Sequence, residues 1–200
     1  MKIRLLLIGL LIMATASTAM AKEAPYLGIS GGVAILHDSD VTVAGVGGGT
    51  MDFDTGVAFN MNAGVELGGG RLEAEFGYKN ADVKAVSAFG NSATVDDSDV
   101  LILSYMLNGY IDIKTESAIK PFIGAGVGLL DAEFRSSGFN SDKDKEFGYQ
   151  FMAGLGFKTD DLVTIDVSYR YQGAPNDFSK NGTSISYNSS NILLGIRANF

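Results

Sequence analysis

The chain has 200 residues, enough for one domain or at most two, and it contains no Cys, no Trp and a single His. The absence of Cys excludes disulfides, thiolate metal sites and cysteine nucleophiles. A net charge of −8 argues against nucleic-acid binding, because a phosphate backbone attracts a basic surface. The 26 glycines follow no Gly-x-y period and stand beside only three prolines, so collagen and proline-rich linkers are excluded as well.

The N-terminal residues 1–21 have the pattern of a secretory signal peptide. Two basic residues precede an uncharged apolar stretch over residues 5–13, and an Ala-Met-Ala cleavage site follows at 19–21. This apolar stretch is shorter than the ~20 residues that a transmembrane helix needs. We therefore predict cleavage before Lys22. Residues 22–200 then form one domain of net charge −10, since the removed segment carries two bases and no acids.

The rest of the chain alternates apolar and polar residues with a period of two, which is typical of β-strands. The clearest example is 71–79, where Arg, Glu, Glu, Gly and Lys alternate with Leu, Ala, Phe and Tyr. We predict strands at 26–36, 58–68, 71–79, 100–113, 121–130, 147–158, 163–172 and 191–200. Short and long connections alternate, which predicts antiparallel neighbours with the short turns at one end. Four long loops, 37–57, 80–99, 131–146 and 173–190, then lie at the other end.

A period of two does not show which face points inward, because a soluble barrel buries its apolar face and a membrane barrel turns that face to lipid. The polar face carries twelve glycines, which exposed strands rarely use but which leave room for larger side chains in a narrow interior. Aromatic residues that form girdles in membrane barrels lie near both strand ends: Phe59, Tyr78, Tyr149 and Tyr171 at the long loops, Phe157 and Phe200 at the short turns. We predict an all-β fold, an eight-stranded antiparallel up-and-down transmembrane β-barrel with the polar face inside.

Charges on the polar face balance, with five acids and five bases. Balance suits a confined interior, where an unpaired charge is costly. We predict an ion-pair network that plugs the barrel, formed by Glu66, Glu73, Glu75, Lys79, Asp112, Asp166, Arg170 and Arg197. The sequence does not give the pairings, and a narrow pore gated by the same residues is the alternative.

Three segments resemble the small outer-membrane β-barrels of Gram-negative bacteria, the OmpA/OmpX-like barrel domain of many surface antigens. They are residues 120–128, 167–171 and 192–200, and the resemblance covers the whole of residues 22–200. It implies location in the Gram-negative outer membrane, with outer-membrane lipids and lipopolysaccharide as partners.

The C-terminus resembles the family's assembly signal, which the barrel-assembly machinery reads. Phe200 ends the chain, and Leu194 and Ile196 supply apolar residues at alternating positions before it. Ala198 departs from the pattern, because the family often has an aromatic residue there.

Candidates for chemistry are sparse. His37 and Ser39 could act as base and nucleophile of a lipid A-modifying hydrolase, but no orienting partner or oxyanion site is evident, so a solvated loop histidine is expected. The glycines of residues 45–50 lack the Lys and the helix of a phosphate loop and predict a flexible loop.

Acidic clusters in the long loops lack the spacing of an EF-hand calcium site. They are Asp96, Asp97 and Asp99, and Asp142 and Asp144. We expect solvated acids, with weak divalent cation binding that bridges lipopolysaccharide as the alternative. We predict no catalytic residue, no metal site and no cofactor.

The sequence therefore predicts an integral outer-membrane barrel, not an enzyme. It would act as a structural envelope component, or as a surface-exposed binding or adhesion protein whose long loops meet host or envelope proteins. Those loops hold fourteen acids and five bases. A narrow channel for small solutes is the alternative, and a lipid A-modifying enzyme is a more distant one.

Overall fold

The computed structural model describes residues 24–43, 47–88, 91–94, 98–136, 142–160, 162–180 and 183–200. The signal peptide expected at residues 1–21 lies outside the described residues and stays a prediction. No described segment is a helix long and apolar enough to span a membrane.

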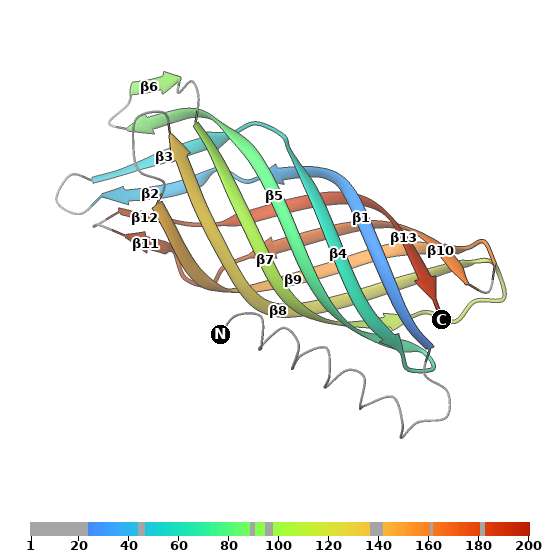
Figure 1. Cartoon of the computed structure of the whole chain (residues 1–200). Helices are drawn as coiled ribbons and strands as arrows, with labels where there is room; N and C mark the ends of the chain where they lie inside the picture. The colour runs from blue at the N-terminus through green and yellow to red at the C-terminus, as the bar shows by residue number, and fades with distance from the viewer. Residues whose placement is uncertain are drawn as a thin grey trace.

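Eight long strands form one closed, tilted barrel (Figure 1). They are β1 (Ala24–Leu36), β4 (Gly56–Glu66), β5 (Gly70–Ala88), β7 (Ser98–Asp112), β8 (Ile119–Ser136), β9 (Asp142–Lys158), β10 (Val163–Gly173) and β13 (Asn188–Asn199). Every neighbouring pair is antiparallel, and the first strand pairs with the last from Tyr26↔Asn199 to Leu36↔Ser189. The predicted eight-stranded antiparallel barrel is confirmed. We call the end with the short connections, where β1 begins and β13 ends, the turn end, and the opposite end the loop end.

Additional strands extend the barrel at the loop end: β2 (Ser39–Val43), β3 (Gly47–Phe53), β6 (Asn91–Thr94), β11 (Phe178–Lys180) and β12 (Thr183–Ile185). They continue as a sheet in the order β11-β12-β2-β3-β5, with β6 on the other side of β5 (Figure 1). We call this sheet, together with the loop-end parts of β8 and β9, the loop-end extension.

The prediction that the long connections are irregular loops was therefore wrong in part. β5 continues to Ala88, β8 continues to Ser136, and β9 begins at Asp142. Residues 47–50 of the glycine-rich segment lie in β3, where Gly49 pairs with Val41, whereas residues 44–46 lie outside the described part. Asp, Ser, Lys and Gly dominate these segments, and their apolar alternation is short, although Ala81, Val83 and Ala132 lie in the apolar cluster of the interior.

The orientation of the two faces follows the prediction. Large apolar side chains cover the outer wall, where Leu107, Ile111 and Leu194 are 68%, 62% and 60% exposed. The polar positions between them point inward, as Asn108 and Gln150, both almost fully buried, illustrate.

The interior is not polar throughout, however. Its loop-end half is filled by a continuous apolar cluster that includes Ile102, Met106, Leu130 and Leu193 on inward positions. Phe178 from β11 and Tyr187 from the connection before β13 also belong to this cluster, which we call the apolar plug. The prediction of a polar face along the whole interior was wrong at this end. The apolar residues occupy inward positions of the same strands as the polar residues, and they pack against one another like the core of a small domain.

Glycines leave room for large inward side chains, and Gly124 is an example. A Cβ atom at this position would lie 2.5 Å from Cδ1 of Tyr110 and 2.9 Å from the carbonyl oxygen of Gly109. Gly109 itself points to the outer wall, and a Cβ there would meet no atom within 4 Å.

Gly124→Ala should therefore destabilise the barrel by about 1–3 kcal/mol, because one methyl group overpacks the interior. Gly109→Ala, one residue away across the same strand pair, should leave stability nearly unchanged. Urea unfolding of the refolded proteins in detergent, followed by circular dichroism, measures both. Equal stability of the two variants would contradict the close packing described here.

Candidate functional site

Charged and polar side chains fill the turn-end half of the interior in successive tiers. In the tier nearest the turn end, Nε of Arg71 lies 3.1 and 3.0 Å from the two carboxylate oxygens of Asp112, and Nη2 lies 3.0 Å from Oδ1. The guanidinium carbon is 4.4 Å from the ring centre of Tyr110 and 4.7 Å from that of Phe122. A guanidinium that pairs with a carboxylate and also stacks on aromatic rings favours arginine over lysine. Arg71 was not among the predicted network residues.

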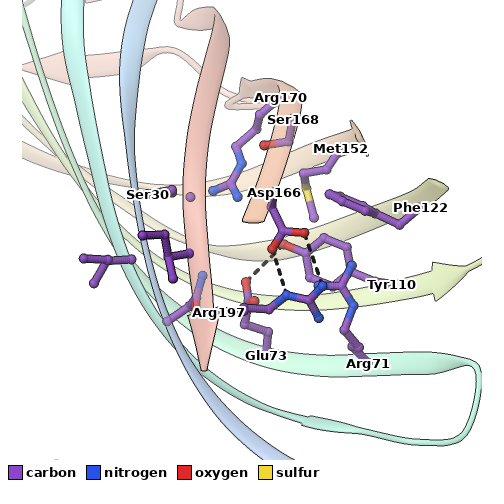
Figure 2. A pocket seen from close by; sticks show the side chains of 14 residues that line it. Ser30, Arg71, Glu73, Tyr110, Phe122, Met152, Asp166, Ser168, Arg170 and Arg197 are labelled. Atoms are coloured by element: carbon purple, nitrogen blue, oxygen red, sulfur yellow. Dashed lines mark hydrogen bonds and ion pairs between the residues drawn. The ribbon is translucent and has the colours of Figure 1, made fainter. Parts of the chain in front are cut away.

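A second arginine completes this tier from β13. Nε of Arg197 donates to Oδ2 of Asp166 at 2.8 Å and Nη2 donates to Oδ1 at 3.2 Å. Nη1 reaches Glu66 Oε1 at 3.4 Å, and the side-chain amide of Asn199 donates to the same oxygen at 3.3 Å. Figure 2 shows Arg197 directed at Asp166, with Arg71 beside them.

Glu73 occupies the next tier, and it forms no ion pair with a basic side chain among the described residues. Its carboxylate accepts hydrogen bonds from the hydroxyls of Tyr26 and Tyr110, both at 3.0 Å, and from the amide of Asn108 at 3.1 Å. Three neutral donors therefore satisfy a carboxyl group that is only 5% exposed.

The centre of the barrel holds the most deeply buried ion pair. Arg170 donates to Glu75, and the two side chains are 6% and 0% exposed. Gln150 also donates to Glu75, at 3.3 Å, and to Asn108 at 2.7 Å, so that the central pair and the Glu73 tier are connected. Gln172 in turn donates to Gln150 at 3.0 Å.

Lys79 lies at the border with the apolar plug. Its ammonium donates to the side-chain oxygens of Gln172 at 2.5 Å, Tyr187 at 3.3 Å and Ser189 at 3.4 Å. Within the described part of the chain it forms no ion pair, and it is 2% exposed. Tyr187 lies outside the barrel strands, and burial raises the pKa of its hydroxyl, which therefore stays neutral.

The structure thus brings the predicted network residues together in separate groups. Asp166 and Glu66 meet Arg197, Glu75 meets Arg170, and Asp112 meets Arg71, whereas Glu73 and Lys79 contact neutral groups. The connecting residues were not predicted as part of the network: Tyr26, Asn108, Tyr110, Gln150, Gln172 and Tyr187. All of these connecting residues except Tyr187 lie on inward positions of the predicted polar face. That inward position is the sequence feature from which they could have been predicted as members of the network.

Little free space remains between the tiers of ion pairs. A cavity of about 40 Å³ lies between Arg71, Asp166, Arg170 and Arg197, with Glu73 at its side (Figure 2). This volume has room for very few water molecules, which would bridge the polar groups around it.

The structure does not assemble the hydrolase that His37 and Ser39 could have formed. Nε2 of His37 lies 2.9 Å from Oγ of Ser190 on the exposed outer side. The hydroxyl of Ser39 instead contacts the carbonyl oxygen of His37 at 3.4 Å, and Ser39 is 4% exposed. His37 is exposed and Ser39 is buried, so these two side chains do not form the base–nucleophile pair of the alternative that the sequence left open.

The acidic clusters show no cation site in the described residues, where no group of three or more His, Asp or Glu side chains could hold a metal ion. Asp96 and Asp97 lie outside the described part. Asp144 uses its carboxylate to accept hydrogen bonds from the backbone N–H of Lys145 and of Ser179, both at 2.8 Å, and thereby joins β9 to β11.

The C-terminal residues of the predicted assembly signal face outward. Leu194, Ile196 and Phe200 are 60%, 51% and 72% exposed on the outer wall. Their role in assembly stays a prediction.

Arg170→Met should cost about 3–5 kcal/mol of unfolding free energy, because it leaves the Glu75 carboxylate buried and uncompensated. The double variant Glu75→Met/Arg170→Met should recover most of this loss. Lys145→Met breaks an exposed ion pair of 3.1 Å with Asp131 and should cost less than about 1 kcal/mol. Urea unfolding compares the variants, and a double variant as unstable as Arg170→Met would contradict this account.

Comparison with known proteins agrees with the geometry. PagN, an outer membrane protein of Salmonella typhimurium, is 27% identical over 82% of this chain and 80% of its own length. A putative adhesin of Rickettsia typhi is 24% identical over 94% of this chain and 97% of its own. The crystal structure of Neisserial surface protein A superposes with a TM-score of 0.61 at 18% identity, over 90% of this chain and 99% of that one, which shows the shared fold. Residues 5–200 match the family described as outer membrane protein beta-barrel domain, and the chain belongs to this family of Gram-negative outer-membrane barrels.

Proposed function

We propose that this protein is a surface-exposed binding protein whose closed barrel anchors the loop-end extension in the outer membrane. Barrels of this kind have short periplasmic turns and longer extracellular loops, so the extension faces the outside. The observation that carries the proposal is the contrast between a filled interior and an ordered, acidic, outward extension.

The charge of the extension is concentrated and accessible. The four long connections hold fourteen acids and five bases. Asp40, Asp54, Asp82 and Asp177 are exposed in the described part. Strand pairing through β2, β3 and β5 holds several of these carboxylates on a rigid sheet, which reduces the entropy lost on binding. A negatively charged surface favours a partner with basic groups.

A relative supports adhesion as the kind of binding. The Rickettsia typhi protein that matches nearly the whole of this chain is named a putative adhesin. An adhesin needs an anchor and an exposed surface, and both are present here. No active site is part of the proposal, and the protein is proposed not to be an enzyme.

The filled interior favours an anchor over the alternative of a narrow channel. The apolar plug occupies the loop-end half, and the arginine–carboxylate pairs occupy the turn-end half. A solute would have to displace both, and breaking buried ion pairs alone costs several kcal/mol.

Replacing Asp38, Asp40, Asp54, Asp82 and Asp177 with Asn should weaken binding to host cells, because it removes five negative charges from the extension. Adhesion of a non-adherent laboratory bacterium that displays the protein is the measurement, and we expect a loss of about tenfold. The control, Glu116→Gln/Asp160→Asn, neutralises exposed acids at the turn end and should leave adhesion unchanged. Wild-type adhesion no higher than that of the empty host would contradict the proposal and favour a structural envelope role.

Planar-bilayer recordings of the purified, folded monomer should show no stable conductance steps. Migration on a gel with and without boiling confirms that the barrel is folded before each recording. Reproducible steps from folded protein would overturn the closed anchor and support the channel.

A further inference from the structure

The turn end of the interior opens into a cavity of about 450 Å³, which lies outside the tiers of ion pairs. Lys114 of the β7–β8 connection, Lys120 of β8 and Lys158 of β9 line it. The arginine pairs form its floor, since Asp112 and Arg197 are lining residues too. In an outer-membrane barrel this opening faces the periplasm.

The inward direction of the lysines is set by strand register. Residues an even number of positions apart on a strand share a face. On β8, Phe122 is buried inside the barrel two residues after Lys120, and on β9 Met152 is buried inside the barrel six residues before Lys158. Lysines that served only to meet lipid headgroups would be expected on the outward positions of these strands. Their inward register indicates a role within the cavity.

Their mutual arrangement is unfavourable without a counter-charge. Lys120 pairs with Gly156, so Lys158 is its diagonal neighbour on the same inward face. Like charges on neighbouring cross-strand positions repel each other. Lys114 adds a third ammonium to the same cavity.

The carboxylates nearby are already engaged. Asp112 is bound by Arg71 and Glu66 by Arg197. Within the residues that the structure describes, neither Lys114 nor Lys120 forms an ion pair. The lining groups therefore sum to a positive charge, whereas the outward extension is strongly negative.

We infer that this cavity, which we call the basic vestibule, binds a small oxyanion carrying a phosphate or carboxylate group. Ammonium groups and oxyanions form strong charge-assisted hydrogen bonds. A mouth whose lining charges sum to a positive value also concentrates anions. The anion is either free in the periplasm or part of a lipid headgroup in the inner leaflet, and the chemistry at the lysines is the same. This inference does not depend on the proposed surface function.

The test is a titration of the full barrel in neutral phosphatidylcholine nanodiscs with inorganic phosphate and pyrophosphate. Backbone amide NMR shifts of residues 114–120 and 156–158 report binding at the mouth. We expect saturable shifts there and none in the extension. Lys120→Gln/Lys158→Gln should weaken the affinity by about tenfold or more, since two charge-assisted contacts are lost.

Lys145→Gln is the matched control, because it removes a lysine from the other end of the same strand β9, and it should bind as the wild type does. Migration of the double variant on a gel with and without boiling shows whether it is folded, so misfolding is recognised separately. Absence of saturable shifts, or equal affinity in the double variant, overturns the inference.

Nanodiscs containing phosphatidylglycerol identify the source of the anion. Loss of phosphate binding in these discs shows that lipid headgroups occupy the vestibule. Retention of phosphate binding shows that the site takes a free anion.

Discussion

Closure of the sheet between its first and last strands is the constraint on which the rest of this structure depends. In hydrocarbon no water satisfies a free backbone N–H or C=O, so a sheet crosses a bilayer only when it has no open edge. The ladder from Tyr26↔Asn199 to Leu36↔Ser189 removes that edge. In the closed barrel every strand has alternate inward and outward positions. Apolar side chains occupy the outward positions, which face lipid, and the inward positions hold side chains that pack or form hydrogen bonds inside the barrel.

Two different solutions fill the inward positions. At the loop end, Ile102, Leu130 and Leu193 pack as an apolar plug that needs no hydrogen bonds. Toward the turn end, arginine–carboxylate pairs and neutral donors engage most of the buried polar groups, whereas Nη2 of Arg71, Oε2 of Glu75 and Nε of Arg170 have no hydrogen-bond partner among the described residues. Because Glu75 is fully buried, any gap in this network would leave an uncompensated charge. Both halves therefore resist opening, which agrees with an anchor better than with a pore.

The distribution of charge follows the same architecture. Interior charges are largely compensated in pairs, so the net negative charge lies on the outward extension, which β3 and the long β5 hold as a continuous sheet. The basic vestibule at the opposite end has the reverse sign. A protein with an acidic exterior face and a basic periplasmic mouth attracts different partners on the two sides of the membrane.

The sequence by itself determined the number of barrel strands, their antiparallel order and which face meets lipid, because a period of two is a local property that each strand displays on its own. It also placed Glu75 and Arg170 inside. Only the tertiary structure decided that these two pair while Glu73 meets tyrosines, since the partners come from strands far apart in the chain. It also decided that the long connections continue as strands. Their mostly polar sequences show only short apolar alternation, and their backbone hydrogen bonds form only when the neighbouring strand is present.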